Sequence, residues 1–238
     1  MASIPTRSIT PLILAGGLGT RLKSVTGQTP KVLAEVRGRP FITYLLDWIQ
    51  CAGFTQAWIS IGYGAEMVMA VIGEEYKGMQ VKYSREYERL GTGGGVALAL
   101  ESIDADAILV MNGDSGVNTS LSGFVDFATQ ENRTALMAVK VLDTSRYGSL
   151  DIDEGVVQQF LEKGRSGEGW INAGVYYLPR AVIETLPKGA SSLETDLLRH
   201  LIGRLRAQCV EADFLDIGTP EDFARATDAD WFDELGTC

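Results

Sequence analysis

The chain has 238 residues, of which 45% are hydrophobic and 22% charged, and its formal net charge at pH 7 is −10. This length suits one large domain with a sizeable core, and no apolar run reaches the roughly 18 residues that a membrane span needs. The acidic balance argues against nucleic acid as the main partner, although a nucleotide needs only a local basic pocket.

The cysteine and histidine content bears on metal binding and on the cellular compartment. Three widely spaced cysteines and a single histidine form no zinc-binding pattern. Such a sparse, odd set suits a reducing compartment, so we expect a cytoplasmic protein without a membrane partner. The oligomeric state stays open, and a homo-oligomer is one of the options.

A glycine-rich turn follows the first expected strand, residues 9–14. The segment LAGGLGTRL covers residues 14–22, and its glycines lack the Cβ atom that would keep backbone N–H groups away from phosphate oxygens. Arg21 and Lys31 stand just downstream, where their charges can neutralise a phosphate. The turn therefore indicates a phosphate loop, with a plain strand-to-helix turn as the simpler alternative.

Two well-known phosphate loops fit this turn poorly. A dinucleotide-binding loop needs G-x-G-x-x-G, but Leu22 occupies the third glycine position, and no acid follows about 20 residues later to bind a ribose. A Walker A loop needs G-x-x-x-x-G-K-[ST], and residues 17–24, GLGTRLKS, have Leu22 at the second glycine. A P-loop kinase is therefore disfavoured.

Helices and strands are expected to alternate after this turn. The apolar pattern predicts helix, strand, helix and strand over residues 40–52, 56–63, 65–75 and 79–84. This alternation predicts a parallel sheet with right-handed crossovers. A second glycine-rich turn, EYERLGTGGG at residues 86–95, is expected to precede a helix over residues 96–103, and by itself it fits a simple loop equally well.

A carboxylate follows the most apolar strand. Residues 107–111, AILVM, lead into Asn112, Gly113 and Asp114. Open α/β sheets bind ligands at the carboxyl ends of central strands, and Mg²⁺ prefers one or two carboxylates together with phosphate oxygens. Asp114 is therefore a candidate Mg²⁺ ligand, with a turn-forming aspartate as the alternative.

The pattern becomes β-rich after Asp143. Antiparallel strands and one further strand are predicted over residues 147–153, 156–162 and 170–178. A helix over residues 193–205 would begin at a capping box formed by Ser191 and Glu194, and a last strand is expected over residues 207–211. Thr219 and Pro220 are typical of a helix start, and Asp216 just before them is either a loop carboxylate or a second metal ligand.

In this order, the motifs resemble those of the sugar-phosphate nucleotidyltransferases, which couple a nucleoside triphosphate to a sugar 1-phosphate. The resemblance covers about residues 9–228 and rests on LAGGLGTRL, Pro30-Lys31, LGTGGG, Gly113-Asp114, Tyr147-Gly148, Glu162-Lys163, Asn172-Ala173-Gly174 and LDIGTP. It implies an α/β fold with a doubly wound, mixed but mostly parallel Rossmann-like sheet and a β-rich acceptor-binding insertion. It further implies one domain over residues 1–238, with a nucleotide-binding half at 9–142 and a sugar-phosphate-binding half at 143–238.

The resemblance also assigns roles to individual residues. The nucleotide would be bound by Leu14, Ala15, Gly16, Gly17, Gly19, Thr20, Arg21, Glu88, Gly91, Thr92, Gly93 and Asn112. The sugar phosphate would be bound by Tyr147, Gly148, Glu162, Lys163 and Asn172. Mg²⁺ would be held by Asp114 and Asp216, and catalysis would rest on Arg21, Lys31, Asp114 and Lys163. Arg21 and Lys31 would stabilise the departing pyrophosphate, and Lys163 would orient the sugar phosphate for in-line attack.

The segments LAGGLGTRLKSV, RPFITYLLDW, LGTGGGVALAL and LDIGTPEDF are most similar to short guanylyltransferases acting on D-glycero-α-D-manno-heptose 1-phosphate. The resemblance implies GTP and that sugar phosphate as substrates, for bacterial surface-polysaccharide synthesis. Gly95 and Ser115 depart mildly from the family pattern. The same frame serves mannose 1-phosphate guanylyltransferases, glucose 1-phosphate thymidylyl- or cytidylyltransferases and N-acetylmuramate 1-phosphate uridylyltransferases. A non-catalytic sugar-nucleotide sensor is the alternative from another class.

Overall fold

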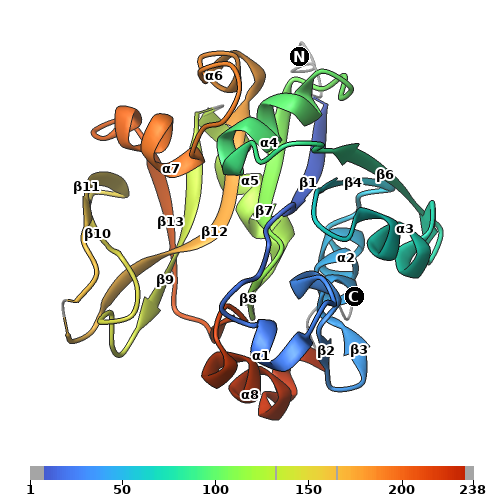
Figure 1. Cartoon of the computed structure of the whole chain (residues 1–238). Coiled ribbons are helices and arrows are strands. Elements are labelled where there is room, and N and C mark those ends of the chain that lie inside the picture. The colour runs from blue at the N-terminus through green and yellow to red at the C-terminus, as the bar shows by residue number, and fades with distance from the viewer. Residues whose placement is uncertain (1–7, 132, 165, 234–238) are drawn as a thin grey trace.

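A computed structural model of the chain describes residues 8–131, 133–164 and 166–233. Its central feature is one large sheet, whose strands appear in Figure 1. They are β1 (Ile9–Ala15), β4 (Gln56–Ile61), β5 (Glu75–Tyr76), β6 (Met79–Arg85), β7 (Ala107–Asn112), β9 (Ala135–Val141), β10 (Ser149–Asp153), β11 (Val156–Leu161), β12 (Gly169–Pro179) and β13 (Arg206–Val210). Two short antiparallel pairs lie beside it, formed by β2 (Glu35–Val36) with β3 (Arg39–Pro40) and by β8 (Ser115–Val117) with β14 (Phe214–Asp216).

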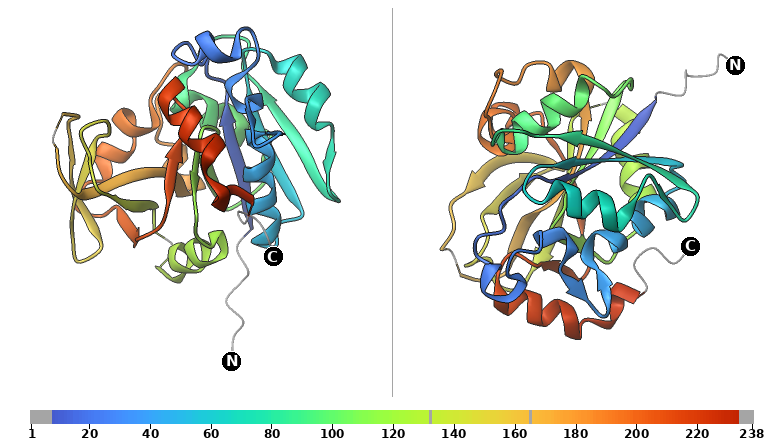
Figure 2. Two further views of the ribbon diagram at one scale, coloured as in Figure 1. Left: turned by 90° about the horizontal axis from the view of Figure 1, so that it is seen from below. Right: turned by 45° about the vertical axis from the view of Figure 1, so that its right-hand side comes forward.

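Helices cover both faces of this sheet, as the two views in Figure 2 show. The α-helices are α1 (Lys23–Thr26), α2 (Phe41–Cys51), α3 (Ala65–Ile72), α4 (Gly91–Leu100), α5 (Leu121–Glu131), α6 (Arg180–Ile183), α7 (Leu193–Asp196) and α8 (Pro220–Asp228). Three short 3₁₀ segments complete the described part, namely η1 (Lys31–Leu33), η2 (Leu198–Leu201) and η3 (Asp230–Asp233). None of these helices is long and apolar enough to cross a membrane.

The sheet joins the two halves of the chain. Its strand order is β10-β11-β13-β9-β12-β7-β1-β4-β6-β5. β1 pairs in parallel with both β4 and β7, and β4 with β6. β12 enters between β7 and β9 and runs antiparallel to both. The expected mixed sheet is therefore confirmed, but the parallel pairing belongs mainly to the first half, because β12 reverses the strand direction.

Two hydrophobic cores hold the layers together, one on each face of the sheet. Along β7, Leu109 and Met111 join the core formed with α2, α3, α5 and α8, whereas Ile108 and Val110 join the core formed with α4, α6 and α7. Successive side chains of a strand point to opposite faces. An uninterrupted apolar run such as residues 107–111 is therefore what a central strand covered on both faces requires.

Two predicted elements differ from the structure. α4 begins at Gly91, so the second half of the segment 86–95 forms the first turns of a helix, whereas the sequence predicts a turn there and a helix start at residue 96. The helix expected over residues 193–205 is divided into α7 and η2, because Leu197 adopts φ −128° and ψ −65° and breaks the helical path. The side chain that caps α7 is Ser192, which accepts from the N–H of Thr195, and not the predicted Ser191.

Candidate active site

Two neighbouring cavities lie at the carboxyl ends of β1 and β7. The first encloses about 260 Å³ and is lined by Leu14, Gly16, Gly17, Leu18, Glu86, Arg89, Gly91, Thr92, Asn112, Gly113 and Asp114. The second encloses about 190 Å³ and is lined by Leu14, Ala15, Gly17, Gly19, Thr20, Arg21, Lys31, Val32, Gly113, Asp114 and Gly218. They share four lining residues, so a ligand longer than either cavity can occupy both. Most residues predicted to bind the nucleotide line one or the other.

The glycine-rich turn after β1 packs closely on its neighbours. A Cβ atom on Gly16 would lie 2.4 Å from Oε1 of Glu86, and one on Gly19, at φ +56°, would lie 3.0 Å from Cβ of Lys31. A Cβ on Gly17 would meet no atom within 4 Å, because this residue faces open space. A positive φ and close packing thus favour glycine at position 19, a Cβ at position 16 would displace the Glu86 carboxylate, and the backbone at position 17 is open to a ligand.

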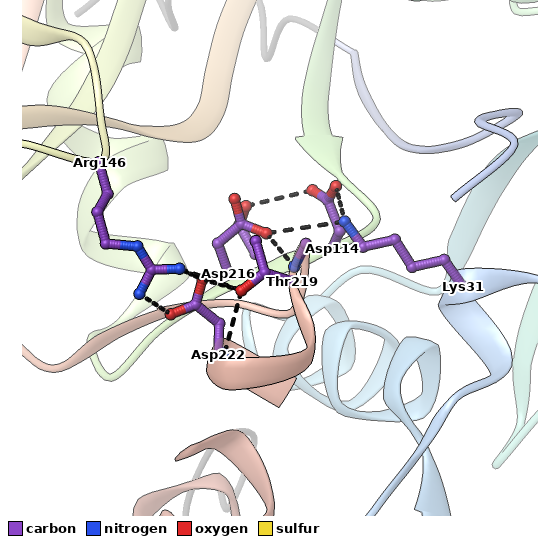
Figure 3. Close-up of polar contacts among 8 residues, drawn as sticks. Lys31, Asp114, Arg146, Asp216, Thr219 and Asp222 are labelled. Carbon is purple, nitrogen blue, oxygen red and sulfur yellow. Dashed lines mark hydrogen bonds and ion pairs between the residues drawn. The ribbon is translucent and has the colours of Figure 1, made fainter. Parts of the chain in front are cut away.

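An ammonium group lies between two carboxylates beside the second cavity, as Figure 3 shows, and Asp114 lines this cavity whereas Asp216 does not. Nζ of Lys31 lies 2.6 Å from Oδ2 of Asp114 and 3.7 Å from Oδ1 of Asp216. η1 supplies the lysine, the turn after β7 supplies Asp114, and the end of β14 supplies Asp216. The structure therefore brings together the two predicted metal ligands and one predicted catalytic cation.

Backbone contacts fix Asp216 beside Asp114. β14 pairs with β8 so that Asp216 lies opposite Ser115, and the N–H of Ile217 donates to the carbonyl oxygen of Asp114 at 2.8 Å. The N–H of Gly218 donates to Oδ1 of Asp216 at 2.6 Å. Burial raises the pKa of the Asp216 carboxyl, and the Asp114 charge adds to this, while Lys31 and the Gly218 N–H oppose it.

Asp114 and Asp216 form a donor set that suits Mg²⁺. Their carboxylates converge on one point, and a cation is already favoured there, as the position of Lys31 demonstrates. Among the residues that the structure describes, no group of three or more histidine, cysteine or acidic side chains could enclose a metal ion. Mg²⁺ keeps several water ligands and takes others from substrate phosphates, so two carboxylates are a sufficient protein contribution.

The second glycine-rich segment lines the first cavity through Gly91 and Thr92. The N–H of Gly93 instead donates to the carbonyl oxygen of Ser191 at 2.9 Å, and Gly93 does not line the cavity. Glu88, the predicted base contact, is exposed to solvent and lines neither cavity.

Glu86 is the acidic residue that the sequence analysis missed. It lines the first cavity, and its Oε1 accepts a hydrogen bond from the Ser60 hydroxyl at 2.9 Å. It directly follows β6, and the carboxyl ends of parallel strands are where such sheets bind ligands. The same rule that selected Asp114 would therefore have selected Glu86 in preference to Glu88. Arg89, which also lines this cavity, has no comparable sequence signal.

None of the predicted sugar-phosphate residues lines either cavity. Asn172 precedes an irregularity in the pairing of β12 with β9, and its Nδ2 donates to the Tyr176 hydroxyl at 2.9 Å. Gly174, at φ +78°, lies so close to Asn112 that a Cβ would be 2.6 Å from Asn112 Nδ2. Asn172-Ala173-Gly174, an irregular part of β12, is therefore adjacent to the first cavity.

The other residues predicted to bind the sugar phosphate divide into two groups. Tyr147 packs edge-on against Phe214, with 5.7 Å between the ring centroids. Phe214 lies two residues before Asp216 in the sequence. Gly148 is adjacent, where an added Cβ would lie 3.1 Å from the carbonyl oxygen of Leu161. Glu162 and Lys163 are exposed just beyond β11, and Glu162 forms a 3.3 Å ion pair with Arg199. Tyr147 is thus close to the paired carboxylates, whereas Glu162 and Lys163 line neither described cavity.

Comparison with known proteins agrees with this arrangement. The nucleotidyl transferase family model matches residues 10–231. This chain belongs to the nucleotidyl transferase family. It is therefore a nucleotidyltransferase, and the non-catalytic sensor considered above is not supported.

The individual proteins that the chain resembles include sugar-phosphate guanylyltransferases. The chain is 32% identical to D-glycero-α-D-manno-heptose 1-phosphate guanylyltransferase of Campylobacter jejuni, over 89% of this chain and 96% of the relative. It is 33% identical to mannose-1-phosphate guanylyltransferase of Mycobacterium tuberculosis, over 93% of this chain and 64% of that longer protein. The crystal structure of HddC from Yersinia pseudotuberculosis matches with a TM-score of 0.84 and 36% identity, covering 93% and 98% of the two chains. HddC has also been crystallised in complex with GMP-PN.

Proposed function

We propose that this enzyme transfers a guanylyl group from GTP to D-glycero-α-D-manno-heptose 1-phosphate, giving the GDP-sugar and pyrophosphate. The observation that carries the proposal is the position of Lys31 between Asp114 and Asp216, beside the glycine-rich turn. Cation and carboxylates at a phosphate loop suit the transfer of a nucleotidyl group between two anionic substrates. The reaction would take place in the cytoplasm and supply bacterial surface-polysaccharide synthesis.

The chemistry follows from these residue types. An oxygen of the sugar phosphate attacks the α-phosphorus of GTP, a new oxygen–phosphorus bond forms, and the bond to the β-phosphate oxygen breaks. Lys31 and Arg21 line the second cavity, where their charges stabilise the departing pyrophosphate. Mg²⁺, bound by Asp114 and Asp216, would withdraw charge from phosphate oxygens. Lys163 would orient the sugar phosphate, and no side-chain nucleophile is required.

Glu86 supports guanine as the base in the first cavity. Guanine offers neighbouring N1–H and N2–H donors, whereas the edges of uracil and thymine offer one N–H between two acceptors. A carboxylate accepts two such donors side by side and repels carbonyl oxygens. Oε1 of Glu86 accepts a hydrogen bond from the Ser60 hydroxyl at 2.9 Å, and Oε2 accepts a weaker one from the N–H of Leu90 at 3.4 Å. Each oxygen can accept a further hydrogen bond.

The proposal is tested by measuring pyrophosphate release for each pairing of ATP, CTP, GTP, UTP or dTTP with the candidate sugar 1-phosphates. These are the 1-phosphates of D-glycero-α-D-manno-heptose, mannose, glucose and N-acetylmuramate. The highest kcat/KM is expected for GTP with the heptose 1-phosphate. Preference for UTP or dTTP would overturn the guanylyl assignment. Ping-pong kinetics with a labelled nucleotidyl-enzyme would overturn direct transfer.

Mannose 1-phosphate is the second candidate acceptor. The specific observation in its favour is the 33% identity to the mannose-1-phosphate guanylyltransferase, which is as high as the identity to the heptose enzyme. The chain matches the full length of the heptose enzyme, however, and only part of the mannose enzyme. The ratio of kcat/KM values for the two acceptors, measured with GTP, decides between them.

A further inference from the structure

Arg146 joins two segments that are far apart in the sequence. It lies in the loop between β9 and β10, and its guanidinium reaches the first turn of α8 (Figure 3). Nη1 and Nη2 donate to the two carboxylate oxygens of Asp222 at 2.8 and 2.6 Å, which is a bidentate pair. Asp222 is buried, with 3% of its surface exposed, whereas the Arg146 side chain remains partly exposed to solvent. Bidentate pairing fixes orientation as well as distance.

Thr219 closes a ring with these two side chains. Its hydroxyl accepts from Nη2 of Arg146 at 3.0 Å and donates to Oδ2 of Asp222 at 3.0 Å. The same hydroxyl caps α8 by accepting from the N–H of Asp222 at 3.2 Å. Arg146 therefore fixes the residue at which α8 begins, and not merely the surface of the helix.

The turn from Asp216 to Thr219 is held at each of its residues. The N–H of Ile217 donates to the Asp114 carbonyl, the N–H of Gly218 donates to the Asp216 carboxylate, and Thr219 belongs to the ring with Arg146. Only two residues, Ile217 and Gly218, separate Asp216 from Thr219. A shift of Thr219 would consequently move Gly218 and the carboxylate that Gly218 orients.

The loop between β9 and β10 also contacts the segment that precedes Asp216. The ring of Tyr147, the residue after Arg146, packs edge-on against Phe214. Arg146 and Tyr147 thus contact the segment 214–222 before and after Asp216. One short loop from the acceptor half thereby holds the turn that carries a predicted metal ligand.

We propose that Arg146 is a positioning residue, which fixes the Asp216 carboxylate opposite Asp114 by bidentate pairing with Asp222 and by its hydrogen bond to Thr219. The inference rests on the proposed function only for the role of Asp216 in transfer. It links the placement of the acceptor loop to that of the paired carboxylates. Loss of the guanidinium would leave the first cavity intact, because none of the residues that line it contacts this ring in the described structure.

A matched control exists elsewhere in the molecule. Arg39 pairs with the buried Asp47 at 2.5 Å, and the exposed fractions of the two arginine side chains are similar, 37% for Arg39 and 41% for Arg146. Neither Arg39 nor Asp47 lines a described cavity at the candidate active site. If these substitutions acted only by lowering the stability of the fold, the Arg39 and Arg146 variants would be affected alike. Misplacement of the Asp216 carboxylate is expected only in the Arg146 variants.

The experiment compares Arg146→Lys and Arg146→Ala with Arg39→Lys and Arg39→Ala. Lysine retains the charge but lacks the planar fork, so Arg146→Lys tests orientation with the least risk to folding. We expect kcat to fall about 10- to 100-fold in both Arg146 variants, because sub-ångström misplacement of a reacting constellation is costly. KM for GTP should change less than kcat in these variants, because the first cavity, which is proposed to take the base, does not include Gly218 and is unchanged. Both Arg39 variants should retain the wild-type kcat at a temperature where all are folded.

Hydrogen exchange provides a readout that needs no substrate. The amides of Ile217 and Gly218 should exchange faster in the Arg146 variants and at the wild-type rate in the Arg39 variants. Unchanged exchange of these amides in Arg146→Ala would overturn the proposal. Faster exchange with an unchanged kcat would also overturn it, because the ion pair of Arg146 with Asp222 would then have only a structural role. A wild-type chain inactive with every substrate pair would overturn the proposed function, while the exchange result would still decide whether Arg146 holds the turn.

Discussion

Nζ of Lys31 lies 2.6 Å from Oδ2 of Asp114, although 83 positions separate the two residues in the sequence. The lysine side chain is 12% exposed, and that of Asp114 is 36% exposed. The amine neutralises the Asp114 and Asp216 carboxylates, which would otherwise repel each other beside the second cavity. It also lies within reach of any phosphate that enters beside the glycine-rich turn. The Lys31 ammonium group thus stabilises the folded protein and would also act in the proposed reaction.

Lys31→Met is expected to lower kcat about 100-fold or more, because a preorganised cation at a developing charge contributes on this scale. Pyrophosphate release under saturating substrates measures the effect. Lys140→Met is the matched control, since Lys140 forms ion pairs with Glu168 and Glu211 outside both cavities and should retain the wild-type rate. A near-normal rate for Lys31→Met would contradict the role assigned to this lysine.

Removal of divalent cations is expected to stop the reaction. EDTA should abolish pyrophosphate release, and Mg²⁺ should restore it, because the paired carboxylates of Asp114 and Asp216 are suited to this ion. Asp114→Asn and Asp216→Asn should each remain folded but bind Mn²⁺ more weakly, as measured by electron paramagnetic resonance. Asp213→Asn, which alters an exposed neighbour of the site, should bind like the wild type. Equal Mn²⁺ affinity in all variants would remove these carboxylates from the metal site.

Gly94→Ala should destabilise the fold and weaken GTP binding together. The added Cβ would lie 2.5 Å from the carbonyl oxygen of Gly189 and 2.7 Å from Cβ of Leu90. Overpacking of this kind costs about 1–3 kcal/mol, and the displaced start of α4 would raise KM for GTP.

The control for Gly94 is Gly123→Ala in α5. A Cβ there would meet only Ser120, at 3.9 Å, so this change should raise the free energy of unfolding by about 0.5 kcal/mol. Urea unfolding and steady-state kinetics of the two variants provide the comparison. An unchanged KM for GTP in Gly94→Ala would show that α4 does not position the first cavity.

Tyr83 should make stability depend on pH in the alkaline range. Burial is the main reason that the pKa of Tyr83 rises to about 12, and Glu74 adds to it. The unfolded chain releases this proton near pH 10, so the folded state binds more protons between about pH 10 and 12. The stabilisation is complete below pH 10 and is lost as the pH rises towards 12. Urea titrations at several pH values should show a smaller alkaline loss in Tyr83→Phe.

Local patterns predicted the parts of the site that depend on neighbouring residues. The turn after β1, the carboxylate after β7 and the Thr219 cap of α8 each follow from a few adjacent residues. Strand ends and helix starts have recognisable signatures in composition, and the resemblance to a family placed them in order. These elements consequently appear in the structure where the sequence indicated them.

Contacts between distant segments were beyond such patterns. Nothing adjacent to Lys31 indicates that it meets Asp114, and nothing near Arg146 indicates Asp222, 76 positions away. The choice of Glu88 over Glu86 failed for a related reason. Which of two nearby acids faces a cavity depends on where β6 ends, and strand boundaries are uncertain by a few residues in sequence-based prediction.

The place of β7 in the sheet has a consequence for the spacing of the two substrates. Its neighbours are β1, which leads into the glycine-rich turn, and β12, which contains Asn172-Ala173-Gly174. Adjacent strands are about 4.8 Å apart, so the main chains of β1 and β12 are separated by about 10 Å, a spacing set by main-chain hydrogen bonds. The strand order therefore fixes how far apart the predicted nucleotide-binding and sugar-binding segments lie. Substitutions of side chains on either segment can change the choice of base or sugar without changing this spacing.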